Sequence, residues 1–296
     1  MRLLITGANG LLGQKIVKQS LEKKEIELIA TGRGECRLPW KGFEYASLDI
    51  TDRTAVLSTF EQYRPEVVIH GAAMTNVDQC ELDHTLCDKN NVESTGYIVE
   101  ACEKHGAHLI FISTDFIFDG EDGPYDESAL PAPVNYYGMS KLMAEQIVQG
   151  SRVKWAILRT VLVYGTSYNP SRSNIVSWVR EKLSSGEGLK IVDDQFRSPT
   201  WSNDLASACL LAVEKTATGL YHISGSDQMS ILELTRRVAR YYHLDESLIS
   251  PIDSQSLEQA ARRPPVTGFI LDKARRDLGY APHSFEETLH LMDEGA

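Results

Sequence analysis

The amino-acid sequence predicts an α/β fold, a doubly wound parallel sheet with a small C-terminal lobe. Three observations predict it. Short, continuously apolar runs alternate with amphipathic stretches over the first half of the chain, as in parallel sheets that are covered on both faces. A glycine-rich turn follows the first apolar run directly. After residue 165 the alternation becomes irregular, which indicates a second and smaller unit.

The first half of the chain supplies most of the predicted sheet. We expect strands at residues 3–6, 26–31, 66–70, 109–113 and 155–164. We expect helices between them at residues 11–23, 54–63 and 92–105. Because connections between parallel strands are right-handed crossovers, this alternation gives a doubly wound arrangement.

The second half contributes mainly helices. We expect them at residues 174–185, 202–215, 231–242, 272–278 and 285–292, with a short strand at 221–224 and a loop-rich stretch at 243–270. Two units are therefore predicted. Residues 1–165 form the first, to which later elements near 202–224 return. Residues 166–296 mainly form a lobe over the strand ends, where such sheets bind ligands.

The composition excludes several classes of partner. The 296 residues carry a net charge of -11, from 41 acidic and 30 basic side chains, so nucleic acid and anionic membranes are not expected partners. No run approaches the roughly 20 apolar residues of a membrane span, and the apolar start is too short for a signal peptide. Five scattered cysteines favour a reduced, cytoplasmic setting.

A glycine turn predicts a dinucleotide site in residues 1–165, which makes this unit a Rossmann domain. The turn reads Gly7-Ala8-Asn9-Gly10-Leu11-Leu12-Gly13 between the first strand and the first helix. Glycines there permit a tight turn and close approach of the backbone to a pyrophosphate, which the helix N-terminus attracts. An ordinary glycine-rich turn is the alternative, because the spacing differs from the usual G-x-G-x-x-G.

Further cofactor contacts are expected at the ends of the next strands. Arg33 ends the second strand, where an acid would favour NAD, and its guanidinium suits the 2′-phosphate of NADPH. NADH stays open, because a solvated surface arginine is the alternative. Asp49 and Ile50 are expected to end a further strand, which lies between those at 26–31 and 66–70, and to flank the adenine. Ala72 and Ala73 come at the end of the strand predicted at 66–70, where small side chains let a cofactor approach.

A tyrosine and a lysine form the predicted catalytic pair. Of the twelve tyrosines, Tyr137 alone has a lysine, Lys141, four residues later, which places both on one face of a helix. A nearby ammonium eases proton transfer from the phenol, and Lys141 is also expected to hold the nicotinamide ribose. Thr114, at a strand end, is expected to bond the substrate oxygen. A surface tyrosine–lysine pair is the alternative.

Some polar residues carry weaker signals. Cys80, His84 and Cys87 lie close together, but a fourth ligand at metal spacing is missing, so we predict buried or half-buried helix residues and no metal. Asn91 is expected to bend its helix or to bridge to a strand.

These motifs resemble the extended short-chain dehydrogenase/reductases, and within them the dTDP-4-dehydrorhamnose reductases, over nearly the whole chain. The segments that carry the resemblance are Gly7–Gly13, Ser113–Gly120, Pro124–Tyr125, Tyr137–Glu145, Arg159–Gly165, Asp194–Thr200, Asp204–Ala206 and Arg263–Pro264. The segment from Asp194 to Thr200 discriminates best, because many members of the larger group lack it.

The resemblance implies a seven-stranded sheet and hydride transfer from NADPH or NADH to C4 of a nucleotide-linked 4-keto-6-deoxy sugar. It implies that Tyr137 donates the proton, Lys141 supports it and Thr114 orients the carbonyl. Pocket-lining residues implied for the substrate are Asp115, Phe116, Asp194, Gln195, Arg197 and Arg263. Members of this group usually supply cell-surface polysaccharide synthesis. A homodimer is left open.

The chain departs from these reductases at three places. Leu162 replaces a common tryptophan that helps to hold the sugar. Arg197 lies where a glycine is common, and we expect it to contact a diphosphate. Pro265 follows Arg263-Pro264, where Asn-Ser is frequent. Two alternatives remain: another reductase or an epimerase of nucleotide sugars, and a non-catalytic regulatory subunit resembling that of methionine adenosyltransferase.

Overall fold

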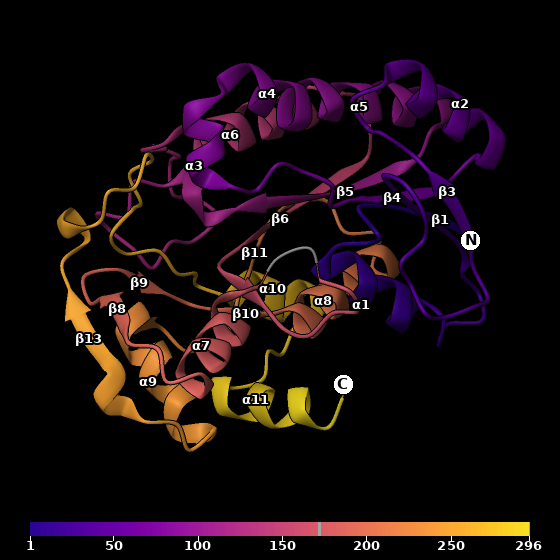
Figure 1. Ribbon diagram of the computed structural model, residues 1–296. Coiled ribbons are helices and arrows are strands. Elements are labelled where there is room, and N and C mark those ends of the chain that lie inside the picture. The colour runs from indigo at the N-terminus through magenta and orange to yellow at the C-terminus, as the bar shows by residue number, and fades with distance from the viewer. Residues whose placement is uncertain (171–172, 296) are drawn as a thin grey trace.

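A seven-stranded parallel sheet forms the centre of the molecule. The computed structural model describes residues 1–170 and 173–295 (Figure 1). Every neighbouring pair in the sheet is parallel, and the order β11-β6-β5-β4-β1-β2-β3 confirms the predicted doubly wound fold. The strands are β1 (Arg2–Thr6), β2 (Glu27–Gly32), β3 (Glu44–Ser47), β4 (Val67–His70), β5 (His108–Thr114), β6 (Trp155–Thr160) and β11 (Gly219–Ile223).

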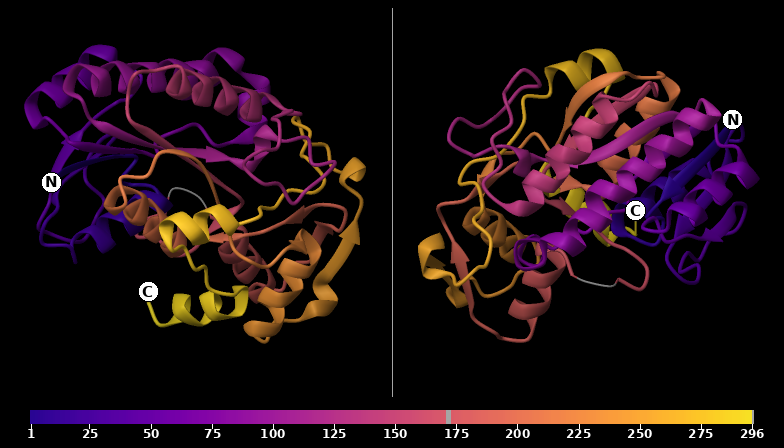
Figure 2. Two further views of the ribbon diagram at one scale, coloured as in Figure 1. Left: turned by 180° about the vertical axis from the view of Figure 1, so that it is seen from behind. Right: turned by 90° about the horizontal axis from the view of Figure 1, so that it is seen from above.

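Helices cover both faces of this sheet (Figures 1 and 2). One layer contains α2 (Arg53–Tyr63), α5 (Ser94–His105) and α6 (Tyr136–Gln149). The opposite layer contains α1 (Leu11–Ser20), α8 (Ser202–Glu214) and α10 (Asp272–Leu278). In β1, Leu3 and Ile5 pack with the α1 and α8 side, and Leu4 packs with the α2 and α5 side. Because side chains alternate along a strand, a continuously apolar strand serves two cores at once.

A separate apolar core holds the C-terminal lobe together. Its buried side chains come mainly from three helices, α7 (Ile175–Ser184), α9 (Ile231–Tyr241) and α11 (Phe285–Asp293). Short strand pairs complete the lobe: β7 (Val163–Tyr164) with β10 (Thr200–Trp201), β8 (Leu189–Val192) with β13 (Ile249–Ile252), and β9 (Phe196–Arg197) with β12 (Met229–Ser230). The boundary at residue 165 stays a prediction, which this separate core supports.

Short helical segments connect the larger elements. They are α3 (Val77–Leu82), α4 (His84–Asp88), the π-helical turn η1 (Lys89–Glu93), and the 3-10 turns η2 (Asp115–Ile117), η3 (Glu246–Leu248) and η4 (Ser254–Ser256). No helix in the described part of the chain is both long and apolar enough to span a membrane.

The predicted strand at residues 155–164 is wrong as a single element. β6 ends at Thr160, and Leu162 takes a backbone φ of +35°, which turns the chain out of the sheet. Thr200 holds the turn, because its Oγ1 donates to the Val161 carbonyl oxygen at 2.6 Å. The chain therefore passes from the carboxyl end of β6 directly into the lobe, where Val163–Tyr164 pairs with β10.

Two further boundaries differ from expectation. The third strand ends at Ser47, so Asp49 and Ile50 follow it rather than end it. The loop-rich stretch at 243–270 contains β13, which pairs with β8 over four residues. Pairing with a distant segment produces β13, and its own four residues show no strong strand pattern.

Candidate active site

The glycine turn is packed too tightly for side chains. Gly7 has a φ of +77°, and a Cβ there would lie 3.0 Å from the Ala72 nitrogen. A Cβ on Gly13 would lie 2.3 Å from the Gly7 carbonyl oxygen. No side chain caps the N-terminus of α1 at Gly10, so its first N–H groups can serve an anion. The turn thus has the form that a pyrophosphate site requires.

Asn9 ties this turn to the chain after β2. Its Nδ2 donates to the Tyr45 hydroxyl at 3.0 Å, and its Oδ1 accepts from the Arg37 backbone N–H at 3.0 Å. Leu11 and Leu12 are half-buried in the first turn of α1. The Asn9 side chain therefore shapes the wall of the predicted site.

The structure brings the other predicted cofactor residues to the same edge of the sheet. Arg33 follows β2 and is exposed. Asp49 follows β3, and its Oδ1 accepts from the Thr51 N–H and hydroxyl at 2.9 and 2.8 Å. Ile50 is buried in the core beside α2. Ala72 and Ala73 follow β4, and the Ala72 N–H donates to Thr6 Oγ1 at 3.2 Å.

Lys141 is buried between α6 and β5. The residue is 3% exposed, and its Nζ donates to the Ile112 carbonyl oxygen at 2.8 Å and lies 4.0 Å from the centre of the Phe111 ring. Burial lowers the pKa of the Lys141 ammonium to about 7, against the opposing charge of Glu145. Because Lys141 is buried, it is not part of a solvated tyrosine–lysine pair, which was the alternative to the catalytic pair.

The helix that carries Tyr137, α6, packs on the turn η2, which begins at Thr114. Asn135 caps α6 by accepting from the Gly138 N–H at 2.9 Å. A Cβ on Gly138 would lie 2.0 Å from the Phe116 carbonyl oxygen, so this glycine lets the helix and the turn touch. The rings of Tyr137 and Phe116 lie edge to face, 6.0 Å apart. Thr114 is 6% exposed at the end of β5 and begins η2.

Asn91 joins the segment that follows β4 to α6. It lies in the π-helical turn η1, between α4 and α5. Its Oδ1 accepts from the Met74 N–H at 2.8 Å, and its Nδ2 donates to Ser140 Oγ at 3.0 Å. Ser140, one residue before Lys141, was not among the predicted site residues. The Tyr-x-x-x-Lys spacing was the available signal for it.

His70 was also missed by the sequence analysis. Burial lowers its pKa to about 3, so the ring is neutral. The Thr95 hydroxyl donates its proton to the Asn91 carbonyl oxygen at 2.7 Å. The Thr95 oxygen must therefore accept from His70 Nε2, at 3.4 Å. His70 Nδ1 then accepts from the Thr6 hydroxyl at 2.7 Å. The fixed tautomer of His70 thereby links β1, through Thr6, to α5, through Thr95.

The predicted substrate residues divide into two groups. Asp115 and Phe116 lie in η2, beside Thr114 and Tyr137. Arg197 belongs with them, because its guanidinium carbon lies 5.7 Å from the centre of the Phe116 ring. Gln195 is 8% exposed, and its Oε1 accepts from Arg197 at 3.4 Å.

Asp194 and Arg263 form the second group, and each contacts residues outside the first group. Asp194 Oδ2 accepts from the Ser254 N–H at 3.1 Å and from its hydroxyl at 2.6 Å. Arg263 forms a two-point ion pair with Asp78, in which both nitrogen–oxygen distances are 2.6 Å. This pair joins α3 to the segment that follows η4.

Cys80, His84 and Cys87 are on α3 and α4, as helix residues. Both cysteines are buried, and Asn91 Nδ2 lies 3.5 Å from the Cys87 sulfur. The prediction of burial is wrong for His84, which is exposed and stacks its ring on that of Tyr136. Within residues 1–170 and 173–295, no three histidine, cysteine or acidic side chains converge as metal ligands would.

Comparison with known proteins identifies the family. The family described as RmlD substrate binding domain matches residues 1–294. The chain belongs to this family. A relative named dTDP-4-dehydrorhamnose reductase, from Aggregatibacter actinomycetemcomitans, is 30% identical over an alignment of 300 positions that covers 97% of each chain. The resemblance predicted from the motifs is therefore confirmed.

Two other similar proteins carry different names and bear on the function of this RmlD-family chain. Methionine adenosyltransferase 2 subunit beta of Xenopus tropicalis is 33% identical over 266 residues, 88% of this chain and 78% of that protein. The solved structure of a dTDP-4-dehydrorhamnose reductase from Bacillus anthracis, in complex with NADP, has a TM-score of 0.87 and 30% identity. The match covers 100% of this chain and 99% of the Bacillus chain.

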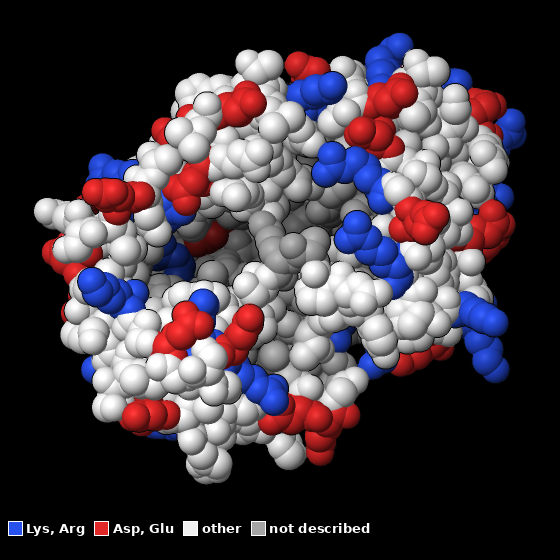
Figure 3. Space-filling view, viewed as in Figure 1, with Lys and Arg blue, Asp and Glu red and all other residues white. Residues whose placement is uncertain are grey.

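The surface of the RmlD-family chain is hollowed between its two units. On the face shown in Figure 3, the hollow separates the sheet-bearing part, above, from the lobe, below, and lysine and arginine side chains stand along its right-hand rim. Leu162 lies at the junction, where it packs against both the sheet core and the lobe core.

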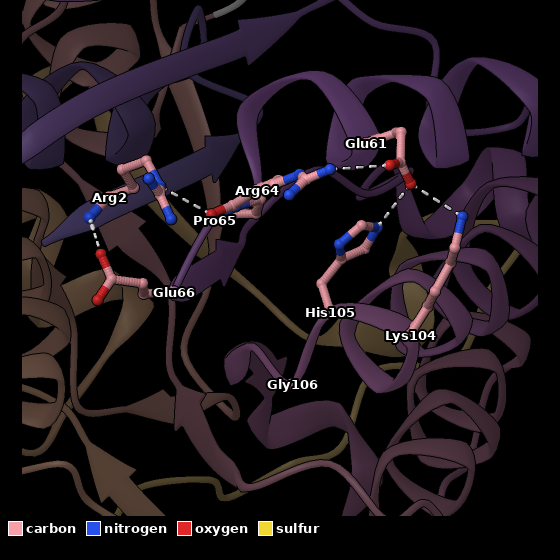
Figure 4. Close-up of a pocket in the computed structure, with 8 residues that line it drawn as sticks. All are labelled: Arg2, Glu61, Arg64, Pro65, Glu66, Lys104, His105 and Gly106. Carbon is pink, nitrogen blue, oxygen red and sulfur yellow. Dashed lines mark hydrogen bonds and ion pairs between the residues drawn. The ribbon is translucent and has the colours of Figure 1, made fainter.

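A second hollow lies at the opposite edge of the sheet. This cavity, of about 690 Å³, is at the amino ends of β1 and β4 (Figure 4). Its charged groups pair with one another: Glu61 lies 3.0 Å from the Lys104 nitrogen and 3.4 Å from Arg64. It contains none of the predicted site residues, and ligands of doubly wound sheets bind at the carboxyl edge.

Proposed function

We propose that this chain is an NADPH-dependent reductase of a nucleotide-linked 4-keto-6-deoxy sugar, namely a dTDP-4-dehydrorhamnose reductase of dTDP-L-rhamnose synthesis. The observation that carries this proposal is the burial of Lys141 one helical turn after Tyr137, at the sheet edge that also holds the glycine turn. The relative from Aggregatibacter, which carries this name, supports the choice of substrate.

The chain's own residues account for the proton side of the reaction. NADPH, when bound, supplies the hydride for C4 of the sugar. Tyr137 donates the proton to the C4 oxygen as the hydride arrives. Lys141, on the same helix face, stabilises the phenolate that remains. Thr114 holds the reacting oxygen beside the phenol, in a site that the lobe shields from water.

The glycine turn and the neighbouring strand ends hold the cofactor in this proposal. The residues concerned are Gly7, Asn9, Gly10, Leu11, Leu12, Gly13, Arg33, Asp49, Ile50, Ala72 and Ala73. Arg33 supports NADPH, because it is exposed beside the β2 end and its guanidinium suits a 2′-phosphate. The Bacillus structure with NADP supports the same choice, and NADH is the competing cofactor.

The lobe and the η2 turn bind the nucleotide sugar in this proposal, through Asp115, Phe116, Asp194, Gln195, Arg197 and Arg263. The basic rim of the hollow in Figure 3 suits a diphosphate, although the chain as a whole is acidic. We further infer a cytoplasmic location. The five free cysteines support the location.

The decisive experiment is a substrate panel. Purified protein is mixed with NADPH or NADH and with nucleotide-linked 4-keto sugars, and nicotinamide absorbance is followed. We expect oxidation of NADPH with the dTDP-linked 4-keto-6-deoxy sugar, loss of turnover in Tyr137→Phe with cofactor binding intact, and normal turnover in the control Tyr241→Phe. Cofactor binding without oxidation of any panel member would contradict the proposal.

A second function is favoured by the relative from Xenopus. Its 33% identity makes a regulatory subunit of a methionine adenosyltransferase the main non-catalytic alternative. A stable complex with such a synthetase, together with an inactive panel, would establish it. Tightly bound NAD(H) that is not consumed would instead indicate an epimerase.

A further inference from the structure

Cys80 and Cys87 form a pair of buried thiols that the proposed reaction does not use. Both residues are 0% exposed, and both are free cysteines. Their side chains are within hydrogen-bonding contact, in which the Cys80 thiol donates to the Cys87 sulfur. Because Cys80 lies on α3 and Cys87 on α4, the contact joins two neighbouring helices.

A break in the helical backbone brings the two sulfurs together. Residues seven apart in one continuous helix are about 10 Å apart along its axis, which is too far for a disulfide. Asp83 interrupts the helix with a φ of -138° and a ψ of 83°. Its side chain caps α4 by accepting from the Leu86 N–H at 2.9 Å. The second helix therefore starts in a new direction, and Cys87 lies against Cys80.

The thiol pair lies close to the surface. Residues 82–86, which separate the two cysteines in the chain, are all exposed, and the Leu82 side chain is 77% exposed. The helices α3 and α4 have six and five residues. Short and largely exposed segments of this kind are among those that open locally. A molecule as small as hydrogen peroxide can therefore reach the sulfurs.

The sulfur of Cys87 also contacts the network that holds Tyr137 and Lys141. Asn91 Nδ2 lies 3.5 Å from this sulfur and donates to Ser140 Oγ at 3.0 Å. Ser140 is itself a neighbour of the Cys87 sulfur, and its hydroxyl donates to the Tyr137 carbonyl oxygen at 2.8 Å. A change at Cys87 is therefore passed to α6 one residue before Lys141.

The two thiols differ in acidity. The hydrogen bond from Cys80 lowers the pKa of the Cys87 thiol, although burial opposes this change. The same hydrogen bond, together with burial, raises the pKa of the Cys80 thiol. Since the thiolate is the reactive form of cysteine, Cys87 is the nucleophile of the pair and Cys80 is the resolving partner.

We propose that Cys80 and Cys87 form a redox site, which a peroxide converts to a disulfide and which thereby slows the reductase. This inference rests on the proposed reductase function, because the reduction step reports its effect. The new bond draws the Cys87 sulfur toward Cys80 and away from Asn91. Ser140 then loses its fixed neighbours, and α6 shifts with respect to β5.

The oxidation is balanced with hydrogen peroxide as the oxidant. The Cys87 sulfur attacks one peroxide oxygen, the O–O bond breaks, and the other oxygen leaves with the thiol proton as water. The Cys80 sulfur then attacks the sulfur of the resulting sulfenic acid. The S–O bond breaks, and the hydroxyl leaves with the Cys80 proton as a second water. The two thiols lose two protons and two electrons, which the peroxide takes up.

The kinetic test treats the full chain with hydrogen peroxide and compares the wild type, Cys87→Ala and the control Cys102→Ala. Cys102 is a buried cysteine of α5, and the exposed Cys36 is present in all three proteins, so its oxidation cancels. We expect kcat to fall on the order of 10- to 100-fold in the wild type and the control, as for a misplaced catalytic group. Dithiothreitol should restore it. Cys87→Ala should have the same kcat before and after treatment.

A peptide map identifies the bond directly. Glu81 and Asp83 lie between the two cysteines, so cleavage after acidic residues separates Cys80 from Cys87. Under non-reducing conditions the two peptides stay together only if a disulfide joins them. We expect joined peptides in the treated wild type and in Cys102→Ala, and separate peptides after reduction.

Several results overturn the proposal. These are separate peptides in the treated wild type, an unchanged kcat in fully joined protein, or an equal fall of kcat in Cys87→Ala.

An untreated wild-type protein that is inactive across the whole panel would instead defeat the proposed function. The peptide map and a crystal structure of the oxidised chain then decide the inference by themselves. Joined cysteines with Ser140 displaced from Asn91 support it, and an unmoved Ser140 overturns it.

Discussion

Arg159 and Glu145 form a two-point ion pair inside the protein. Arg159 Nε lies 3.0 Å from Glu145 Oε1 and Nη2 lies 2.7 Å from Oε2, and the side chains are 2% and 0% exposed. Glu145 follows Lys141 by one turn of α6, and Arg159 lies on β6. The pair therefore fixes α6 to the sheet one helical turn after Lys141.

Breaking this pair should destabilise the fold strongly. Arg159→Met leaves a buried carboxylate without its partner, which costs about 3–5 kcal/mol of unfolding free energy. The double variant Arg159→Met with Glu145→Leu should recover most of this loss, because neither charge stays buried. Chemical denaturation measures both. A double variant as unstable as the single one would show that packing, and not the unpaired charge, dominates.

Lys141 should make stability depend on pH above neutrality. Its pKa in the folded chain is lowered to about 7, and its ordinary value is 10.5. Between these values the unfolded chain binds more protons, so the unfolding free energy should rise as pH increases from about 7 to 10.5. Lys141→Met should lack this rise.

Denaturation of both proteins at several pH values provides the measurement. Lys15, whose pKa is lowered to about 8, titrates in the same window, but it is present in both proteins and cancels in the difference. Identical pH dependence of the two would mean that the Lys141 ammonium is not buried.

Gly13→Ala should abolish cofactor binding. Its Cβ would lie 2.3 Å from the Gly7 carbonyl oxygen and 2.6 Å from the Ala8 Cα, and both are backbone atoms that can move only by opening the turn. Titration with NADPH, followed by fluorescence, measures the loss. Gly96→Ala is the matched control, because a Cβ at this helical glycine of α5 meets nothing within 4 Å. Retained affinity in Gly13→Ala would place the cofactor elsewhere.

Arg33 should discriminate between the two nicotinamide cofactors. Arg33→Glu removes a charge-assisted bond worth about 1.5–3 kcal/mol, so the Kd for NADPH should rise by roughly 10- to 100-fold. The Kd for NADH should change little, because NADH has no 2′-phosphate. Arg275→Glu, an exposed arginine on α10, controls for net charge. Equal weakening of both cofactors in Arg33→Glu would contradict the NADPH assignment.

The doubly wound sheet was predictable because its strands are buried on both faces. Leu3, Leu4 and Ile5 are all fully buried, so the sequence shows a continuous apolar run there. The break after Thr160 was not predictable in this way. Val161 is apolar and buried, as a strand residue would be, and the turn depends on Thr200, forty residues later.

By itself the sequence determined the local chemistry of this protein: a glycine turn after the first strand, and a tyrosine and a lysine one helical turn apart. Both are short-range patterns, in which spacing alone sets which side chains share a face. The tertiary structure alone decided the partners of the buried charges. Thr267 and Asp115 are separated by 152 residues, and no local pattern records that this hydroxyl donates to the buried carboxylate. Burial makes such pairing obligatory, but which groups pair depends on how distant segments pack.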